Sequence, residues 1–183
     1  MANSERIILI DADVVSHFVT AGQADCLKQI FPDNPIRILD KVHAELQQWP
    51  SAAMRTEVSR LISKKIIRLM DFPDDNDEIV REYAWIKTML FKGEGESACL
   101  AVARFNKQIL ASSNLKDIKN YCVTHKIDYL TTMDFLCEAI RMRLFNEQQC
   151  NSFITKVKTA GGRLPVSTME EYTCRAINFL TAQ

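Results

Sequence analysis

The stretch Ile7-Ile8-Leu9-Ile10-Asp11-Ala12-Asp13 decides the fold, because a four-residue apolar run is followed at once by two carboxylates. A short apolar run of this kind is typical of a buried strand. Carboxylates at the rim of an apolar sheet repel each other and are costly to remove from water, so they imply a positive counter-charge such as a metal ion. This stretch therefore predicts a buried strand with a charged site at its end.

Similar apolar runs recur along the chain and predict further strands at 36–39, 66–70, 108–111 and 127–131. Amphipathic stretches separate nearly all of them and predict helices at about 40–49, 51–64, 77–91, 95–106, 114–125, 133–145, 147–159 and 168–181, with Asn76 and Thr132 among the N-caps. Alternation of strands and helices favours a parallel sheet. We expect an α/β fold, a three-layer α/β/α sandwich with a mostly parallel sheet of about four to five strands.

The length and composition fit one domain over residues 1–183, with a core at about 7–145 and a helical C-terminal extension at about 146–183. The 23 basic residues balance the 23 acidic ones, so no global basic field points to nucleic acid. The six cysteines form no CxxC pair and are expected to be reduced core thiols. With no signal peptide and no apolar stretch of membrane-spanning length, we expect a soluble, cytoplasmic protein.

Glu45 interrupts the apolar face of the helix expected at 40–49, where Val42, Leu46 and Trp49 share one side. Taken alone, a glutamate at the edge of that face whose carboxylate reaches water is the commoner interpretation. Glu45 therefore needs support from other residues before it indicates a site.

The segment Gly93-Glu94-Gly95-Glu96 precedes a helix of small and apolar residues that is expected to be buried. The two glycines allow close backbone approach. Glu96 lies in the first turn of that helix, where the macrodipole favours negative charge, so both capping and a binding site explain it. Glu94 is assigned to capping.

A polar junction, Ser112-Ser113-Asn114, follows the strand expected at 108–111 and would project from the same sheet edge as Asp11. The competing interpretation is an N-cap at Asn114, with Asp117 three residues later in a near capping box. Both roles can coexist.

Carboxylates from separate strand ends of one parallel sheet should converge, because ligands of such folds bind beyond the carboxyl ends of the strands. Hard oxygen ligands without a His or Cys set suit Mg²⁺ or Mn²⁺ rather than zinc. His17, His43 and His125 lack metal-ligand spacing and are expected to be partly exposed helix residues.

The order of Ile-Asp-Ala-Asp-Val-Val at 10–15, Val-x-x-Glu-Leu at 42–46 and Gly-Glu-Gly-Glu-Ser-Ala at 93–98, followed by a polar junction after a strand, resembles the PIN domain over about residues 7–145. The resemblance implies an α/β/α metal-dependent nuclease, of which many are ribonuclease toxins of bacterial toxin–antitoxin pairs. It implies Asp11, Glu45 and Glu96 as catalytic acidic ligands of Mg²⁺ or Mn²⁺ and RNA as substrate. An antitoxin protein or a second copy of the chain would be the protein partner.

The chain departs from the family pattern at the fourth acidic position, where an Asp usually follows two residues after Thr or Ser and Asn114 stands here. An amide oxygen can coordinate a metal but brings no charge. Asp117, one turn later, is the candidate substitute, although placing Leu115 towards the core puts it on the helix flank. Asp13 stands where the family often has Asn and supplies compensating charge. Ser112 and Ser113 are auxiliary candidates at the same junction.

Lys64 and Lys65 belong to a basic stretch that would contact the phosphates of a substrate, although a solvated helix face explains the same charges. Trp49, Trp85 and Phe91 are expected in the core, with base stacking as the second interpretation.

Two other functions remain open alongside a metal-dependent ribonuclease. Asp11-x-Asp13 after a strand also resembles the opening of haloacid-dehalogenase-like phosphatases, with Asp11 as nucleophile and Asp13 as acid/base. Those enzymes need a later Lys and a second acidic pair at a strand end, whereas this chain has Gly-Glu-Gly-Glu at the start of a helix. The third interpretation is a weakened PIN-like module that binds RNA or a protein without cutting, because Asn114 lacks the carboxylate.

Overall fold

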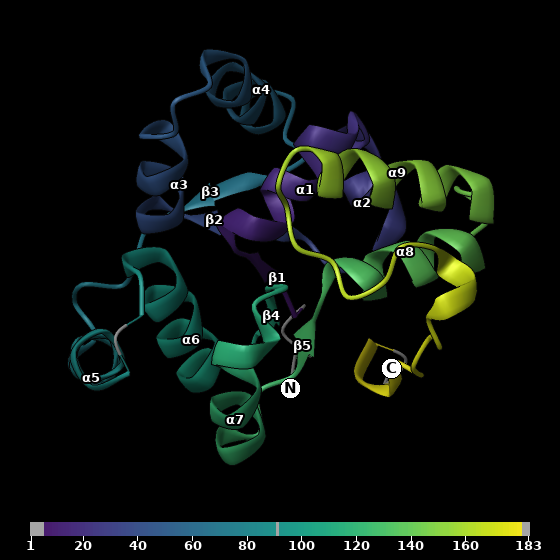
Figure 1. Ribbon diagram of the computed structural model, residues 1–183. Coiled ribbons are helices and arrows are strands. Elements are labelled where there is room, and N and C mark those ends of the chain that lie inside the picture. The colour runs from purple at the N-terminus through teal and green to yellow at the C-terminus, as the bar shows by residue number, and fades with distance from the viewer. Residues whose placement is uncertain (1–5, 91, 181–183) are drawn as a thin grey trace.

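A computed structural model describes residues 6–90 and 92–180 and contains a five-stranded sheet in which every pairing is parallel (Figure 1). The sheet order is β3-β2-β1-β4-β5. The strands are β1 (Ile8–Ile10), β2 (Ile36–Leu39), β3 (Arg68–Met70), β4 (Ile109–Ala111) and β5 (Tyr129–Leu130). Each strand lies within one of the predicted apolar runs, and the predicted parallel α/β fold is confirmed.

Helices cover both faces of the sheet and make a three-layer α/β/α sandwich, as predicted. Figure 1 shows α5, α6 and α7 on one side of the sheet and α1, α2, α8 and α9 on the other. The helices described are α1 (Ala12–Ala21), α2 (Leu27–Ile30), α3 (Asp40–Gln47), α4 (Ala52–Ser63), α5 (Asp77–Met89), α6 (Glu94–Asn106), α7 (Leu115–His125), α8 (Thr132–Arg141) and α9 (Glu147–Thr159). α1 and α2 had not been predicted individually.

The two central strands are apolar throughout, because helices bury both of their faces. Every residue of β1 and of β4 is fully buried, whereas Arg68 and Leu69 of the edge strand β3 are exposed. Unbroken apolar runs are the mark of such doubly covered parallel strands. From β1 the chain builds outward through β2 to β3, then returns and adds β4 on the other side. The strand order therefore reverses between β1 and β4, where a crevice for ligands is expected at the carboxyl ends.

The C-terminal extension differs from the prediction after α9. In place of a helix over 168–181, the described residues form two short 3₁₀ turns, η2 (Met169–Glu171) and η3 (Asn178–Leu180), joined by non-helical chain. Two side-chain tethers hold that chain: Cys174 is disulfide-bonded to Cys137 of α8, and Arg175 donates to both carboxylate oxygens of Asp134 at 2.8 Å. These two tethers favour a non-helical conformation of the chain between η2 and η3.

The cysteine prediction was wrong for one pair. Cys137 and Cys174 form a disulfide, whereas the expected free thiols are present at Cys26, Cys99, Cys122 and Cys150. In the described part of the chain, no helix is both long enough and apolar enough to cross a membrane.

Several local predictions also need correction. Asn76 caps α5 as predicted, but α8 is capped by Thr131 rather than Thr132, in a capping box with Asp134. Trp85 is 47% exposed because α5 turns Ile79 and Ile86 to the core instead. Leu115, placed towards the core by the sequence pattern, is 37% exposed at the first position of α7. Phe91 lies outside the described residues.

Candidate functional site

Asp11 sits at the carboxyl end of β1, at the point where the strand order reverses. Its backbone N–H donates to the Ala111 carbonyl at 2.9 Å, which extends the pairing with β4 by one residue. Its carboxylate Oδ1 accepts from the Ala12 N–H at 2.8 Å and caps α1. The residue is only 7% exposed. The backbone on both sides thus fixes a buried carboxylate at the sheet edge.

Asp13, in the first turn of α1, joins the β1–α1 junction to the β4–α7 junction. Its Oδ2 accepts from the Ser113 N–H at 2.7 Å, and the buried Ser112 Oγ lies 3.5 Å from the same oxygen. Its Oδ1 accepts from the Val14 N–H at 2.6 Å. The auxiliary residues Asp13, Ser112 and Ser113 therefore meet at one place.

Glu45 projects from α3 and is held by the two glycines before and within α6. The Gly95 N–H donates to Glu45 Oε1 at 2.9 Å. A Cβ added at Gly95 would lie 2.8 Å from Glu45 Oε2 and 2.9 Å from Val42 Cγ2, and one at Gly93 would lie 3.3 Å from Oε1. These glycines are required because the carboxylate of Glu45 lies against their backbone. Glu45 is half-buried and does not simply snorkel into water.

Glu96 and Asn114 are in direct contact. The Asn114 Nδ2 donates to Glu96 Oε1 at 3.2 Å. Asn114 is the N-cap residue of α7, as the capping interpretation expects, and its amide also contacts Glu96, whereas the capping box with Asp117 stays a prediction. The side chain of Asp117 lies outside the described part of the structure.

The four acidic residues act on one another electrostatically. Burial, followed by the negative charges of Asp13, Glu96 and Glu45, holds the pKa of Asp11 well above its ordinary value. Burial also raises the pKa of Asp13, even though hydrogen bonds from Ser113 and its neighbours oppose the shift. Among the residues described, no ion pair includes Asp11, Asp13 or Glu45. The site therefore concentrates negative charge that a cation would stabilise.

The acidic residues fit a hard divalent cation by donor chemistry and charge. Carboxylate and amide oxygens are the ligands that Mg²⁺ and Mn²⁺ prefer. Within the ranges that the structure describes, however, no group of three or more His, Cys, Asp and Glu side chains is already arranged to hold a metal ion. Backbone N–H groups of Ala12, Val14, Gly95 and Ser113 engage carboxylate oxygens of this cluster instead. Binding a metal would require these carboxylates to turn towards a common point.

Lys64 and Lys65 are not brought to the acidic residues. Both are exposed and lie between α4 and β3, before the strand begins. In an all-parallel sheet that is the edge opposite to the carboxyl ends at which Asp11 and Ser113 lie.

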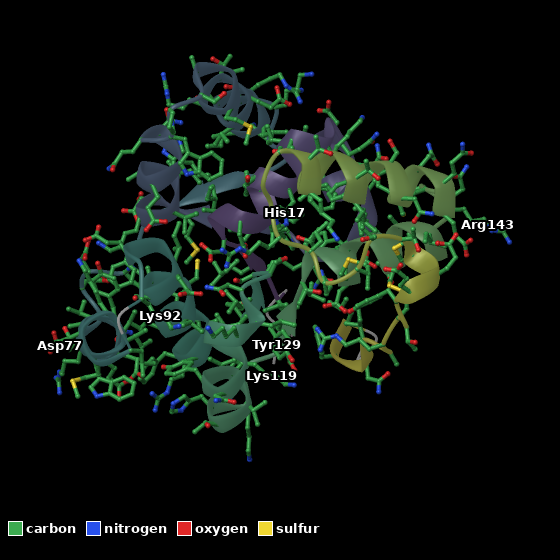
Figure 2. The ribbon with its side chains drawn as sticks, in the orientation of Figure 1. His17, Asp77, Lys92, Lys119, Tyr129 and Arg143 are labelled. Carbon is green, nitrogen blue, oxygen red and sulfur yellow. A yellow bond between two sulfur atoms is a disulfide. The ribbon has the colours of Figure 1, made fainter. Side chains whose placement is uncertain are left out.

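His17 and Thr132 were not recognised as site residues in the sequence, because only the fold brings them to the site. The His17 Nδ1 lies 2.9 Å from Thr132 Oγ1, which in turn lies 2.7 Å from Ser113 Oγ. His17 is 6% exposed rather than partly exposed as expected, and burial lowers its pKa to about 4. Figure 2 shows it near the centre of the molecule, inside the arc of the chain that follows α9. The polar pair directly after β5, Thr131-Thr132, was a sequence signal of the same kind as Ser112-Ser113 directly after β4.

Comparison with known proteins gave no family model, no curated protein and no solved structure that matches the chain.

Proposed function

We propose that the protein is a metal-dependent ribonuclease of the PIN type, which hydrolyses RNA phosphodiester bonds at the acidic residues. The observation that carries the proposal is Asp11, a buried carboxylate whose pKa is raised by burial and by Asp13, Glu96 and Glu45 at the reversal point of the sheet. Buried charge of one sign is costly unless a ligand compensates it. A divalent cation meets that need and would in turn attract an anionic phosphodiester.

The residues of the site divide into those that would hold the metal and those that position the metal ligands. Asp11, Glu45 and Glu96 would hold Mg²⁺ or Mn²⁺, with Asn114 or Asp117 completing the set. The bound ion would neutralise the scissile phosphate and lower the pKa of the attacking water.

Three contacts position these acids. The Gly95 N–H orients Glu45, the Asn114 amide orients Glu96, and the Ser113 N–H fixes Asp13. Asp13 adds negative charge behind Asp11 and strengthens the attraction for a cation.

The test is cleavage of an end-labelled single-stranded RNA by the purified full-length chain with Mg²⁺ or Mn²⁺. EDTA should stop cleavage and Asp11→Asn should abolish it, while both proteins unfold at similar urea concentrations. Asp75→Asn, in the exposed turn after β3, is the matched control and should cleave normally. Full activity of Asp11→Asn would overturn the assignment.

A second candidate is a PIN-like module that binds RNA or a protein partner without cutting. Two observations favour it: Asn114 supplies no carboxylate, and the described residues contain no group already arranged for a metal. Calorimetry decides between the two, since a module of this kind would bind RNA but take up no Mn²⁺. Turnover of p-nitrophenyl phosphate without RNA cleavage would instead favour a phosphatase with Asp11 as nucleophile. A toxin role, with an antitoxin as partner, stays a prediction.

A further inference from the structure

A cavity of about 770 Å³ opens directly beside the acidic residues. Asp13, Ser113 and Asn114 belong both to its wall and to the acidic site. The opposite wall comes from the segment that follows α9, including Gly161 and Arg163. In Figure 1 this segment leaves α9, passes in front of α1 and then runs beside α8. The volume lies in the range of sites that enclose a small ligand.

We propose that this cavity binds one unpaired nucleotide of the RNA strand, next to the phosphodiester that the acidic residues cleave. The inference rests on the proposed ribonuclease function and adds to it a subsite built by the C-terminal extension. Because the cavity and the acidic site share Asp13, Ser113 and Asn114, a chain lying across the acids would place its next nucleotide in the cavity.

The lining has the two kinds of surface that a nucleotide needs. Met133, Leu164, Pro165 and Tyr172 supply apolar and aromatic area on which a base can lie. The exposed cations Lys116 and Arg163 come from different elements. Among the described residues neither of these cations is in an ion pair, so both remain available to a phosphate group.

Lys116 has a second source of attraction for phosphate. It lies in the first turn of α7, a helix of 11 residues, where the helix dipole also favours an anion. Lys116 and Arg163 thus supply positive charge beside the acidic residues. This arrangement suits a ligand that carries phosphate charge and an apolar ring together.

The wall formed by the C-terminal extension is held in place before any ligand binds. Lys158 of α9 donates to the Val166 carbonyl at 3.3 Å and to Ser167 Oγ at 2.8 Å. Tyr172 lies two residues before Cys174, whose disulfide fixes the chain to α8. A preformed wall lowers the ordering cost of binding.

One consequence is a requirement for single-stranded RNA. A base can enter the cavity only after it has left its stack, which costs least in an unpaired strand. We therefore expect cleavage of single strands in preference to duplexes, with a base preference set by the cavity.

The first arm of the test measures binding without metal. AMP and UMP are titrated into the full-length protein in EDTA and followed by amide NMR shifts, which should concentrate at 113–116 and 161–164. Leu164→Trp should narrow the cavity where the base would lie and weaken binding, and Arg163→Ala should weaken it about tenfold, as loss of a charge-assisted contact does. Lys119→Ala, on α7 but outside the cavity lining, is the matched control for charge and should bind as the wild type does.

The second arm measures RNA cleavage with Mn²⁺. Arg163→Ala should raise the KM for single-stranded RNA about tenfold at little change in kcat, since Arg163 lies outside the acidic site. RNA cleavage with unchanged KM and base preference in both variants would overturn the cavity proposal and leave the ribonuclease intact. Nucleotide binding without any RNA cleavage would overturn the ribonuclease proposal and leave a nucleotide cavity. Because Arg163 is exposed, its variant keeps the test decisive if Leu164→Trp does not fold.

Discussion

Removing the Cys137–Cys174 disulfide should lower the free energy of unfolding by about 4 kcal/mol. The bond joins residues separated by 37 positions, and the chain-entropy relation for a closed loop of that length gives this value. Arg175 still donates to both oxygens of Asp134, which is 1% exposed, so the folded chain should keep its course after the bond is lost. The stability change then arises mainly from the greater freedom of the unfolded chain.

The assay is urea unfolding of the wild type and of the Cys137→Ser/Cys174→Ser variant, each with and without a phosphine reductant. Only the wild type should shift on reduction, and it should shift to the midpoint of the variant. Cys26→Ser removes a free thiol and serves as control. Alkylation with mass spectrometry counts the thiols before unfolding. A wild type that carries the bond yet has the same midpoint with and without reductant would refute the entropy argument, and protein that forms no bond under oxidising conditions would refute the pairing.

Three other variants test the site and its surroundings. His17→Gln should remove a pH dependence of the free energy of unfolding. Burial lowers the pKa of His17 to about 4, so as the pH falls the unfolded chain takes up a proton before the folded one does. Relative to the variant, the wild type should therefore lose up to about 3 kcal/mol of stability between pH 6.5 and pH 4. Equal slopes in urea unfolding across that range would contradict this. Gly95→Ala should force Glu45 away, destabilise the fold by about 1–3 kcal/mol and weaken Mn²⁺ binding in calorimetry, and unchanged affinity would exclude Glu45 as a ligand. Asn114→Asp should tighten Mn²⁺ binding about tenfold through its added charge, while repulsion from Glu96 destabilises the metal-free protein; if neither changes, Asn114 lies outside the metal set.

The strands could be predicted from the sequence because the sheet is covered on both faces. β1 and β4 bury all of their side chains, so their apolar runs are unbroken and stand out against the amphipathic helices between them. The glycines before Glu96 were also informative, because a glycine in a polar helix start indicates close backbone approach, and Gly95 indeed meets Glu45.

The C-terminal extension could not be predicted in the same way, because its conformation depends on partners far away in the chain. Cys174 and Arg175 are held by Cys137 and Asp134, which are 37 and 41 residues distant, whereas helical periodicity reports only on neighbours within a few turns. The burial of His17 has the same origin, since Thr132 lies 115 residues away. The cavity depends on this extension and could therefore not be predicted from the sequence pattern.

The site loses less negative charge at Asn114 than the missing carboxylate alone suggests. Under the proposed PIN assignment, a carboxylate is expected where Asn114 stands, and Asn often stands at the position of Asp13. Here Asn114 and Asp13 have the reverse arrangement. Because Asp13 Oδ2 accepts from the N–H of Ser113, the residue directly before Asn114, the carboxylate gained on α1 contacts the junction that lost one. Asp11 consequently still has three acidic neighbours, all of which raise its pKa. Since attraction for a divalent cation depends on the summed charge around the site, the exchange is compatible with metal binding, and the geometry of Asn114 rather than the number of carboxylates becomes the deciding property.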